Sequence, residues 1–563
     1  MAVRVYSAEE AYAMLASDSE TLSAEDLDYL LSSSSSSLSD NEEPPRQRRR
    51  LAARDPHLEP ITDWSPPTNY TPQIPAFTAT AGVHAQTEGL SELDFFQLFF
   101  SADLLQLMVE QTNLYAEQFI AAHPNSFLAQ PNRWHPTNCA ELLKYWGLVL
   151  NMGLNKKTEV RSYWSTDVLY HCPLYRNTMT RPRFEALQKF LHFSDNSQCP
   201  PQEDPRFDRL NKIRPVINIL ARNFSSLYTP KKEISVDESL VSFKGRVKFR
   251  QYLPNKRAQY GLKLYKLCES DTAYMYAFRV YEGKDSHIDP PGCPSFISTS
   301  GKIAWDLLRP LFDQGYHLYL DNWYTSVPLF KCLLEKKTVA CGTVRKNQKH
   351  LPKTLINQRL TIGESRALLH DGVLCLKYRD KKDVCMLTSI HDDASTSVPR
   401  RGFTSAKMTP VCIQAYNKFM GGVDLNDQIL KPYSAMRRSR IWYKKLAVNL
   451  VQMALYNSFV LYRKAGNHGT YLEYQEKVIK RLILGEEVGE TSASSSNVGR
   501  IIPGQHFPGL VPCTGKKRQA QKRCRVCFKK GIRRDTIYQC DTCPSKPGLC
   551  MKECFRIFHT SLD

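Results

Sequence analysis

The sequence predicts a multidomain α/β protein in which a helical region, a mixed α/β region and a small cysteine-rich module follow one another. Three observations lead to this prediction. Residues 90–230 carry dense apolar residues at helical spacing. Residues 231–347 contain three short β-rich segments and then alternate between helix and strand patterns. Seven of the 17 cysteines lie between Cys513 and Cys554.

The first 89 residues form an expected disordered tail, because serine runs, acidic clusters and proline-rich stretches cannot build a core. Residues 1–94 hold 16 acidic and 6 basic side chains, so they carry a net charge of −10, whereas the whole chain carries +20. The basic run at residues 46–54 is either a nuclear-import signal or a charge-balanced turn. The remaining chain carries +30, which favours a polyanionic partner, most commonly nucleic acid.

The helical region has recognisable start and stop signals. Asn138 is placed to cap a helix that Gly153 would end, and Pro215 should kink or restart a later helix. A long amphipathic segment after residue 440 should pack back on this first helical region. Residues 348–410 read as an insertion of loops around a hairpin at Asp380–Asp383.

These patterns give a complete set of expected boundaries. The segments are 1–89 tail, 90–230 helical domain (first part), 231–347 α/β domain (first part), 348–410 insertion, 411–433 α/β domain (last part), 434–484 helical domain (second part), 485–515 linker and 516–563 cysteine-rich domain.

Four aspartates occur where the predicted elements change. Asp237 lies within a strand, Asp321 ends a strand, and Asp424 follows a double glycine with Asp427 one helical step behind it. Aspartate is depleted in strands, so each position needs a reason. Taken singly, Asp321 could cap the following helix.

Lys244 and Arg246 follow Asp237 in the same segment, and either could pair with its carboxylate or contact DNA.

Taken together, the aspartates predict a metal site, because adjacent strands of one sheet would bring Asp237 and Asp321 close. Clustered carboxylates repel unless hard cations neutralise them, and oxygen ligands suit Mg²⁺ or Mn²⁺. Two such ions roughly 4 Å apart support in-line phosphodiester displacement.

The motifs SVDESLVSFKGR, YLDNWYTS, CGTVRKN and YNKFMGGVDLNDQ occur in this order. They resemble the catalytic core of piggyBac-family transposases, over most of residues 93–465 and again in the cysteine-rich module. The resemblance implies a ribonuclease H-like catalytic domain with an insertion, flanked by an all-α dimerisation and DNA-binding domain. It implies that Asp237, Asp321 and Asp424 form a catalytic triad and that Asp427 is a neighbouring acid. It also implies that Arg345 and Lys346 contact DNA.

The resemblance also implies cut-and-paste transposition by a nuclear enzyme, a homodimer that cleaves double-stranded DNA at terminal inverted repeats. Cleavage would proceed through a hairpin, and the freed 3′-hydroxyl would attack a TTAA target. The alternative is a domesticated descendant, a nuclear DNA-binding protein without transposition activity.

The cysteine-rich tail has a metal-binding signature, because two Cys-x2-Cys pairs are separated by twelve residues. Seven ligands suggest two interleaved Zn²⁺ sites. In a cross-brace, one ion would bind Cys524, Cys527, Cys550 and Cys554, and the other Cys540, Cys543 and His559. Cys513, Asp541 or Asp563 could supply an eighth ligand, or one site is open; His506 lies upstream of the module.

Residues 516–534 contain ten Lys or Arg and no acid, so they form a solvated linker, an import signal or a phosphate-contacting segment. The expected contacts are Lys516, Lys517, Arg518, Lys522, Arg523 and Arg525, and the resemblance implies that this module recognises the terminal repeats.

Other functional classes fit less well. The start of the chain has no signal pattern and no apolar run reaches the ~20 residues that span a bilayer, so an intracellular protein with reduced cysteines and no membrane partner is expected. A chromatin reader or ubiquitin ligase would leave most of the chain unexplained. A glycosidase could use paired carboxylates, but the basic body does not suit a sugar.

Overall fold

The computed structural model describes residues 61, 63–126, 128, 133–254, 259–284, 286, 288–398, 407–485, 506, 508–512, 520–543, 545–551 and 553–560. The chain forms two compact units, residues 1–488 and 489–563. The expected tail before residue 61, its basic run, Cys513, Asp563 and Lys516, Lys517 and Arg518 lie outside the described residues. No helix among the described residues is both long and apolar enough to cross a membrane.

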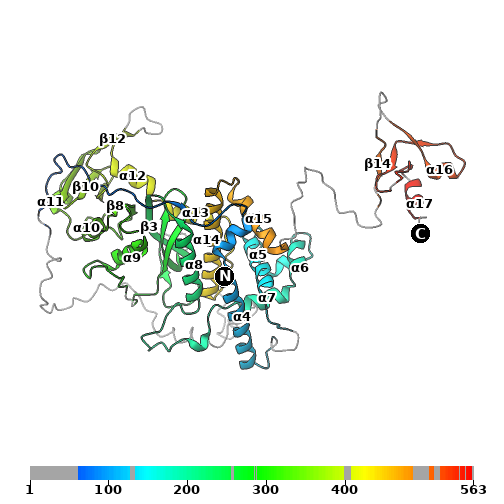
Figure 1. The fold of residues 1–563 in the computed structure, drawn as a ribbon, viewed down its shortest axis with the longest axis horizontal. Coiled ribbons are helices and arrows are strands. Elements are labelled where there is room, and N and C mark those ends of the chain that lie inside the picture. The colour runs from blue at the N-terminus through cyan, green and yellow to red at the C-terminus, as the bar shows by residue number, and fades with distance from the viewer. Residues whose placement is uncertain are drawn as a thin grey trace, which may run out of the picture. The chain divides into compact units, whose positions relative to one another are not determined.

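The helical region is assembled from two stretches of the chain (Figure 1). Its first helices are α3 (Glu92–Phe99), α4 (Ala102–Ala122), α5 (Cys139–Leu154), α6 (Pro173–Thr178), α7 (Arg181–Phe190) and α8 (Arg214–Leu227), with short 3₁₀ turns η3 (Arg161–Trp164) and η4 (Asn196–Gln198). The second stretch supplies α14 (Trp442–Lys464) and α15 (Tyr471–Leu484).

The predicted helix signals are mostly confirmed. Asn138 caps α5, because its side chain accepts a hydrogen bond of 3.0 Å from the backbone N–H of Glu141. Pro215 lies in the first turn of α8, so the helix restarts there. Gly153 does not end α5; a Cβ at Gly153 would lie 2.2 Å from the carbonyl oxygen of Tyr433, so it permits close packing instead.

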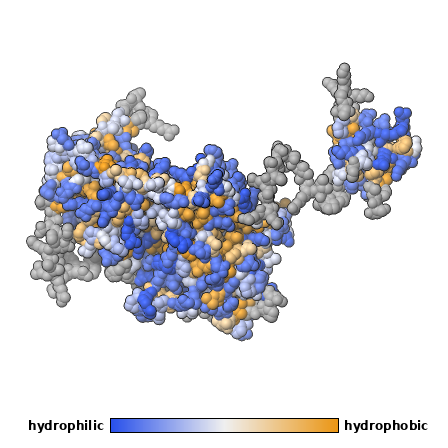
Figure 2. Space-filling view, in the orientation of Figure 1, coloured by the Kyte–Doolittle hydropathy of each residue, from blue (hydrophilic) through white to orange (hydrophobic). Residues whose placement is uncertain are grey.

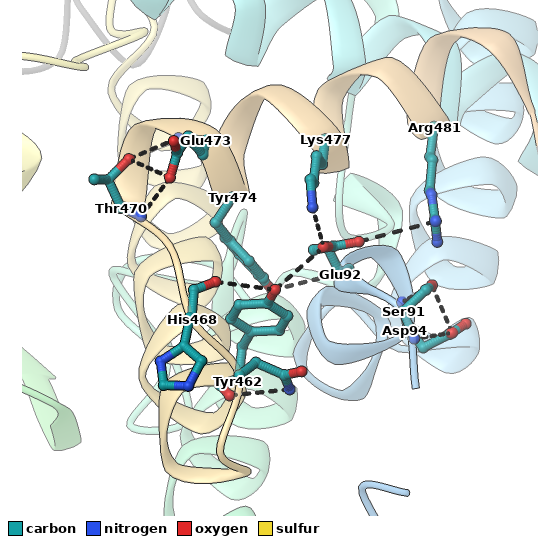
Figure 3. Close-up of polar contacts among 11 residues, drawn as sticks. Ser91, Glu92, Asp94, Tyr462, His468, Thr470, Glu473, Tyr474, Lys477 and Arg481 are labelled. Atoms are coloured by element: carbon teal, nitrogen blue, oxygen red, sulfur yellow. Dashed lines mark hydrogen bonds and ion pairs between the residues drawn. The ribbon is translucent and has the colours of Figure 1, made fainter. Parts of the chain in front are cut away.

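The late helices pack back on the first ones, as the sequence predicts (Figure 3). Glu92 of α3 is buried, and its carboxylate accepts hydrogen bonds from Lys477 Nζ of α15 at 2.8 Å and from the Tyr462 hydroxyl of α14 at 3.3 Å. The Tyr474 hydroxyl donates to the Glu92 carbonyl at 3.1 Å. One buried carboxylate therefore joins three helices that are distant in the sequence.

A nine-stranded mixed sheet forms the centre of the larger unit. Its order is β4-β5-β3-β7-β8-β11-β10-β9, with β6 paired to the outer side of β5, and β7 runs parallel to both β3 and β8. The strands are β3 (Glu233–Ser242), β4 (Gln251–Tyr252), β5 (Tyr260–Glu269), β6 (Met275–Val280), β7 (His317–Leu320), β8 (Val339–Thr343), β9 (Ser365–His370), β10 (Val373–Arg379) and β11 (Asp383–Thr388).

Helices follow or interrupt these strands. They are α9 (Thr299–Leu308), the 3₁₀ turn η5 (Arg309–Leu311), α10 (Val327–Glu335), α11 (Lys353–Asn357), α12 (Val411–Phe419) and α13 (Gly422–Leu430). The sequence-predicted break at Gly421–Gly422 separates α12 from α13.

The insertion is more regular than expected. The predicted hairpin is present, with Arg379 opposite Asp383. The expectation that loops surround it is wrong, because β11 pairs with β8 and thereby extends the central sheet through the insertion. A separate pair, β12 (Ser395–Val398) and β13 (Lys407–Pro410), leads into α12.

The expectation of disorder through residue 89 is wrong for residues 63–89. Ser65 exchanges backbone hydrogen bonds with Leu369 of β9, and Thr78 N–H donates to the carbonyl of Gln314. β1 (Gly82–Val83) pairs with β2 (Tyr228–Thr229). Aromatic anchors explain the order, since Phe77 packs edge-on against Tyr316 with ring centroids 5.1 Å apart.

The described residues of the smaller unit form two short sheets and two short helices. β14 (Pro508–Leu510) pairs with β17 (Tyr538–Cys540), and β15 (Lys522–Arg523) pairs with β16 (Asp535–Thr536). The helices are α16 (Arg525–Lys529) and α17 (Cys554–Thr560). Because β14 belongs to this fold, the module begins before the expected start at residue 516. Hydrophilic residues cover most of its visible face (Figure 2).

Candidate active site and metal-binding module

Two of the predicted acids are neighbours across paired strands. The parallel register of β3 and β7 sets Ile234 beside Leu318 and Val236 beside Leu320, so Asp237 and Asp321 come next along it. Neighbouring strands lie about 4.8 Å apart. Side chains alternate along a strand, so both aspartates share the sheet face that carries Ser235 and Tyr319.

Helices α12 and α13 cover that same face. A Cβ at Gly422 would lie 2.6 Å from Ser235 Oγ, so a glycine is needed where α13 meets β3. The Phe419 ring at the end of α12 lies 5.2 Å from the Tyr319 ring. Asp424 lies in the first turn of α13, the helix that packs on the face carrying Asp237 and Asp321. The structure thus sets Asp237 and Asp321 side by side and places Asp424 on a helix packed against their strand.

The carboxylates currently accept hydrogen bonds from nearby backbone. Asp237 Oδ1 accepts from the N–H of Glu238 at 2.8 Å, and Asp321 Oδ1 accepts from the N–H of Trp323 at 2.7 Å. Asp321 does not cap α10, whose N-cap residue is Ser326, so the capping alternative is wrong. Asp237 and Asp321 offer two carboxylates on one sheet face, and oxygen donors of this kind fit Mg²⁺ or Mn²⁺.

Tyr416 lies close enough to both strand acids to feel their charge. Burial raises the pKa of Tyr416 to about 12, and the negative charges of Asp321 and Asp237 add to this rise. Tyr416 lies on α12. The two carboxylates therefore produce a shared negative potential beneath the covering helices, which a cation would relieve.

Asp427 has a different environment from the triad. Its Oδ1 accepts hydrogen bonds from Lys266 Nζ at 2.7 Å and from Ser239 Oγ at 2.8 Å. Lys266 is 0% exposed, also donates to Asn426 Oδ1 at 3.0 Å, and lies directly opposite Asp237 in the β3–β5 pairing. A buried ammonium group thus joins α13 to β5, the strand beside β3, and the sequence patterns did not predict it.

The basic residues near the site differ in their partners. Arg345, just after β8, donates through Nε to Asn322 Oδ1 at 2.8 Å, which places its guanidinium next to Asp321. Lys346 instead pairs with Asp383 at 2.7 Å. Lys244 and Arg246 are exposed after β3.

The first cysteine group matches the predicted ligand set. The ligand atoms of Cys524, Cys527, Cys550 and Cys554 lie within 4.8 Å of one another. Cys527 Sγ and Cys554 Sγ are 3.6 Å apart, close to the roughly 3.8 Å edge of a tetrahedron with Zn–S bonds of about 2.3 Å. Burial alone would raise the pKa of the Cys524 thiol, but hydrogen bonds from the backbone of Cys527 and Cys550 lower it to about 7.

The second group adds His506 to the predicted residues, because the ligand atoms of His506, Cys540, Cys543 and His559 lie within 4.8 Å of one another. Its Nδ1 lies 3.6 Å from Cys540 Sγ and 3.4 Å from Cys543 Sγ, while His559 Nε2 lies 3.4 Å from Cys543 Sγ. His559 Nδ1 contacts the Phe555 carbonyl at 2.7 Å, a partner that leaves Nε2 as the ligand atom.

The register of β14 explains how His506 reaches this group. Pro508 pairs with Cys540, so the antiparallel course of β14 sets His506 across from the turn between Cys540 and Cys543. Asp541, one candidate for the eighth ligand, instead accepts a hydrogen bond from Gln539 at 2.8 Å.

Comparison with known proteins matches both units of the chain to described families. Residues 91–459 match the family model described as Transposase IS4, and residues 506–560 match one described as DDE_Tnp_1-like zinc finger. The human PiggyBac transposable element-derived protein 3 is 22% identical over 463 residues, which cover 80% of this chain and 73% of that protein.

Two further relatives are similar to the chain. The human PiggyBac transposable element-derived protein 2 is 25% identical over 394 residues, covering 67% of this chain and 62% of that protein. Among solved structures, a piggyBac transposase synaptic complex with hairpin DNA matches with a TM-score of 0.63 and 24% identity, covering 83% of this chain and all of that one. This likeness establishes a shared fold.

Proposed function

The chain belongs to the Transposase IS4 family, within which it is similar to the piggyBac transposases, and from this premise we propose that it is an active cut-and-paste DNA transposase. The reaction would be metal-dependent cleavage of double-stranded DNA at terminal inverted repeats, followed by hairpin formation and strand transfer into TTAA. The observation that carries the proposal is the register that sets Asp237 and Asp321 side by side on paired strands, with Asp424 on the helix that packs on their face.

In this proposal Asp237, Asp321 and Asp424 are the catalytic residues of a ribonuclease H-like domain, and they would hold two Mg²⁺ or Mn²⁺ ions. Bound divalent cations supply an activated oxygen nucleophile and stabilise the leaving oxygen. The rigid strand pairing of β3 and β7 fixes two carboxylates before DNA arrives, so no reorganisation of the acids is required.

Asp427 acts as a positioning residue, which revises its expected place among the catalytic acids. Its Oδ1 is taken by Lys266 and Ser239, and these bonds anchor the turn of α13 that follows Asp424. Arg345 is positioned by Asn322 to meet a DNA phosphate beside the reacting strand. Lys346 has an acidic partner and would share this phosphate-binding role.

The C-terminal module is a zinc-finger domain, and we infer that it holds two structural Zn²⁺ ions and binds the terminal repeats. Exposed basic side chains near its start would contact the phosphate backbone, while Lys244 and Arg246 would contact DNA at the catalytic unit. Lys522 is engaged with Gln539 Oε1 at 2.7 Å, and Arg523 and Arg525 lie over the rings of Phe528 and Phe558. Lys516, Lys517 and Arg518 belong to the same proposal on sequence grounds.

A nuclear homodimer completes the proposal, with the helical domain as the dimerisation region. That domain exposes an apolar loop between η3 and α6, in which Val168 is 90% and Leu169 is 82% exposed. Exposed apolar side chains of this kind commonly mark protein interfaces.

Excision from a donor plasmid that carries the terminal repeats tests the function. Wild-type protein with Mg²⁺ should release the element, and Asp321→Ala should abolish release. Asp393→Ala, which removes an exposed acid of the insertion, is the matched control and should retain activity. Excision that survives Asp321→Ala would contradict the catalytic assignment. A wild type that binds the repeats without excising them would favour a domesticated DNA-binding protein.

A further inference from the structure

A basic cleft lies in the insertion, outside the catalytic triad. It encloses about 630 Å³ between the segment after β8, the end of α11 and the hairpin β10–β11. Its charged lining residues are Lys346, Arg359, Lys377, Arg379 and Asp383. This set contains four cationic side chains and one carboxylate, so the cleft carries a net positive charge of three.

The single acid of the lining is shared among three of the cations. Asp383 accepts from Lys346 Nζ and from Arg379 Nη1, each at 2.7 Å, and its carboxylate lies 3.5 Å from Lys377 Nζ. Hydrogen bonds from Lys346 and Arg379 hold the pKa of Asp383 well below its usual range. One carboxylate cannot neutralise this many cations, so the cleft attracts a further anion.

Arg359 is the one cation of the described cleft lining that does not contact Asp383. Among the residues that the structure describes, it forms no ion pair, and its side chain is exposed at the mouth of the cleft. The nearest acid in sequence, Glu364, is bound to Thr361 and Arg366 and does not line the cleft. A guanidinium without a carboxylate partner, beside other cations, is a donor suited to a phosphate oxygen.

The floor of the cleft is rigid. Lys377 is 2% exposed, and its ammonium group donates to the carbonyls of Ile356 at 2.7 Å and Gln358 at 2.5 Å. These bonds tie the segment that carries Arg359 to strand β10. The positive groups are therefore held in place before any ligand binds, which lowers the entropic cost of binding.

The cleft adjoins the proposed catalytic site through two consecutive residues. Arg345 reaches Asn322, the neighbour of Asp321, while Lys346 turns to Asp383 in the cleft. Because β8 pairs with both β7 and β11, the sheet connects the strand that ends at Asp321 with the hairpin that carries Asp383. No aromatic ring lines the cleft, so its described side chains can bind a phosphate but cannot stack on a base.

We propose that this cleft is a phosphate-binding site that holds a backbone phosphate of the DNA next to the reacting strand, with Arg359 and Arg379 as its principal donors. The proposal rests on the proposed transposase function. It assigns the insertion a sequence-independent grip on the DNA, distinct from terminal-repeat recognition by the zinc-finger module.

Salt dependence of DNA binding tests the proposal. The affinity of the full chain for a fluorescent duplex without terminal repeats is measured by anisotropy over a NaCl series, for the wild type and for Arg359→Gln. Each lost phosphate contact lowers the magnitude of the log K against log [salt] slope by about 0.9. We expect a decrease of about one for Arg359→Gln, with a similar loss of affinity on every duplex sequence. The exposed position of Arg359 leaves folding intact.

Arg366→Gln is the matched control, because it removes one exposed positive charge of β9 outside the cleft. Equal slopes for the wild type and Arg359→Gln, or equal decreases in both variants, would overturn the proposal. Stabilisation by inorganic pyrophosphate in a thermal shift assay, with no change of DNA slope in Arg359→Gln, would assign the cleft to a free polyphosphate and also overturn it. A wild type that fails to bind any duplex would instead contradict the transposase function.

Discussion

Removing Asp427 from the Lys266–Asp427 pair should lower the free energy of unfolding more than removing Lys266. Lys266 is 0% exposed, whereas Asp427 is 36% exposed. Asp427→Ala therefore leaves a buried ammonium group with Asn426 as a remaining acceptor, and removing one partner of a buried pair costs about 3 kcal/mol. Lys266→Met leaves a carboxylate that water and Ser239 can still solvate, so it should cost only about 1 kcal/mol.

The double variant Lys266→Met/Asp427→Ala should recover part of this loss, because no unpaired charge stays buried. Urea unfolding of the four proteins gives the free energies of unfolding and the coupling between the two positions. Asp427 is either a catalytic acid or a positioning residue, and strand cleavage measured against Mg²⁺ concentration separates these two roles. A positioning residue predicts a lower cleavage rate in both single variants, with partial recovery in the double variant. Equal stability losses in the single variants, or a double variant as unstable as their sum, would refute the reasoning.

Three further predictions concern other parts of the chain. Burial lowers the pKa of His317 to about 4, whereas in the unfolded chain this pKa is about 6.5, so the unfolded chain binds the proton first as the pH falls. Between pH 6.5 and 5 the wild type should therefore lose about 2 kcal/mol more of its free energy of unfolding than His317→Gln, measured by urea titration. Equal losses in the two proteins would contradict this. His506→Ala should reduce the zinc measured by elemental analysis from two ions per chain to one, and two retained ions would exclude His506 as a ligand. Val168→Asp with Leu169→Asp should shift sedimentation from dimer to monomer, and an unchanged dimer would place the interface elsewhere.

The closeness of Asp237 and Asp321 could be predicted from the sequence, because each acid lies in or ends an apolar strand pattern and adjacent strands would bring the two together. Asp237 and Asp321 follow strand patterns that are readable without a structure, and the double glycine before Asp424 marks a close approach. The buried anchor Lys266 was missed because it alternates with apolar residues in its segment, a pattern that also fits an exposed position. Its signal was that β5 is apolar on both faces, so a lysine within it has to be buried.

Long-range contacts explain the remaining differences. Residues 63–89 have the composition of a disordered tail, and their order comes from pairing with Leu369 and Thr229, which no local pattern reveals. His506 lies 18 residues before Cys524, beyond the usual spacing of a zinc motif, and only the register of β14 brings it to Cys540. Local signals therefore identified the elements, whereas contacts between distant segments had to come from the structure.

Metal rescue at Asp321 tests the central claim most directly. The variant Asp321→Cys replaces a carboxylate oxygen by sulfur, which binds Mg²⁺ poorly and softer Mn²⁺ better. Cleavage of a labelled duplex that carries a terminal repeat should be lost with Mg²⁺ and partly restored with Mn²⁺, while the wild type should cleave with either ion. Cleavage by Asp321→Cys at the wild-type rate in Mg²⁺ would contradict the claim that Asp321 holds the catalytic metal.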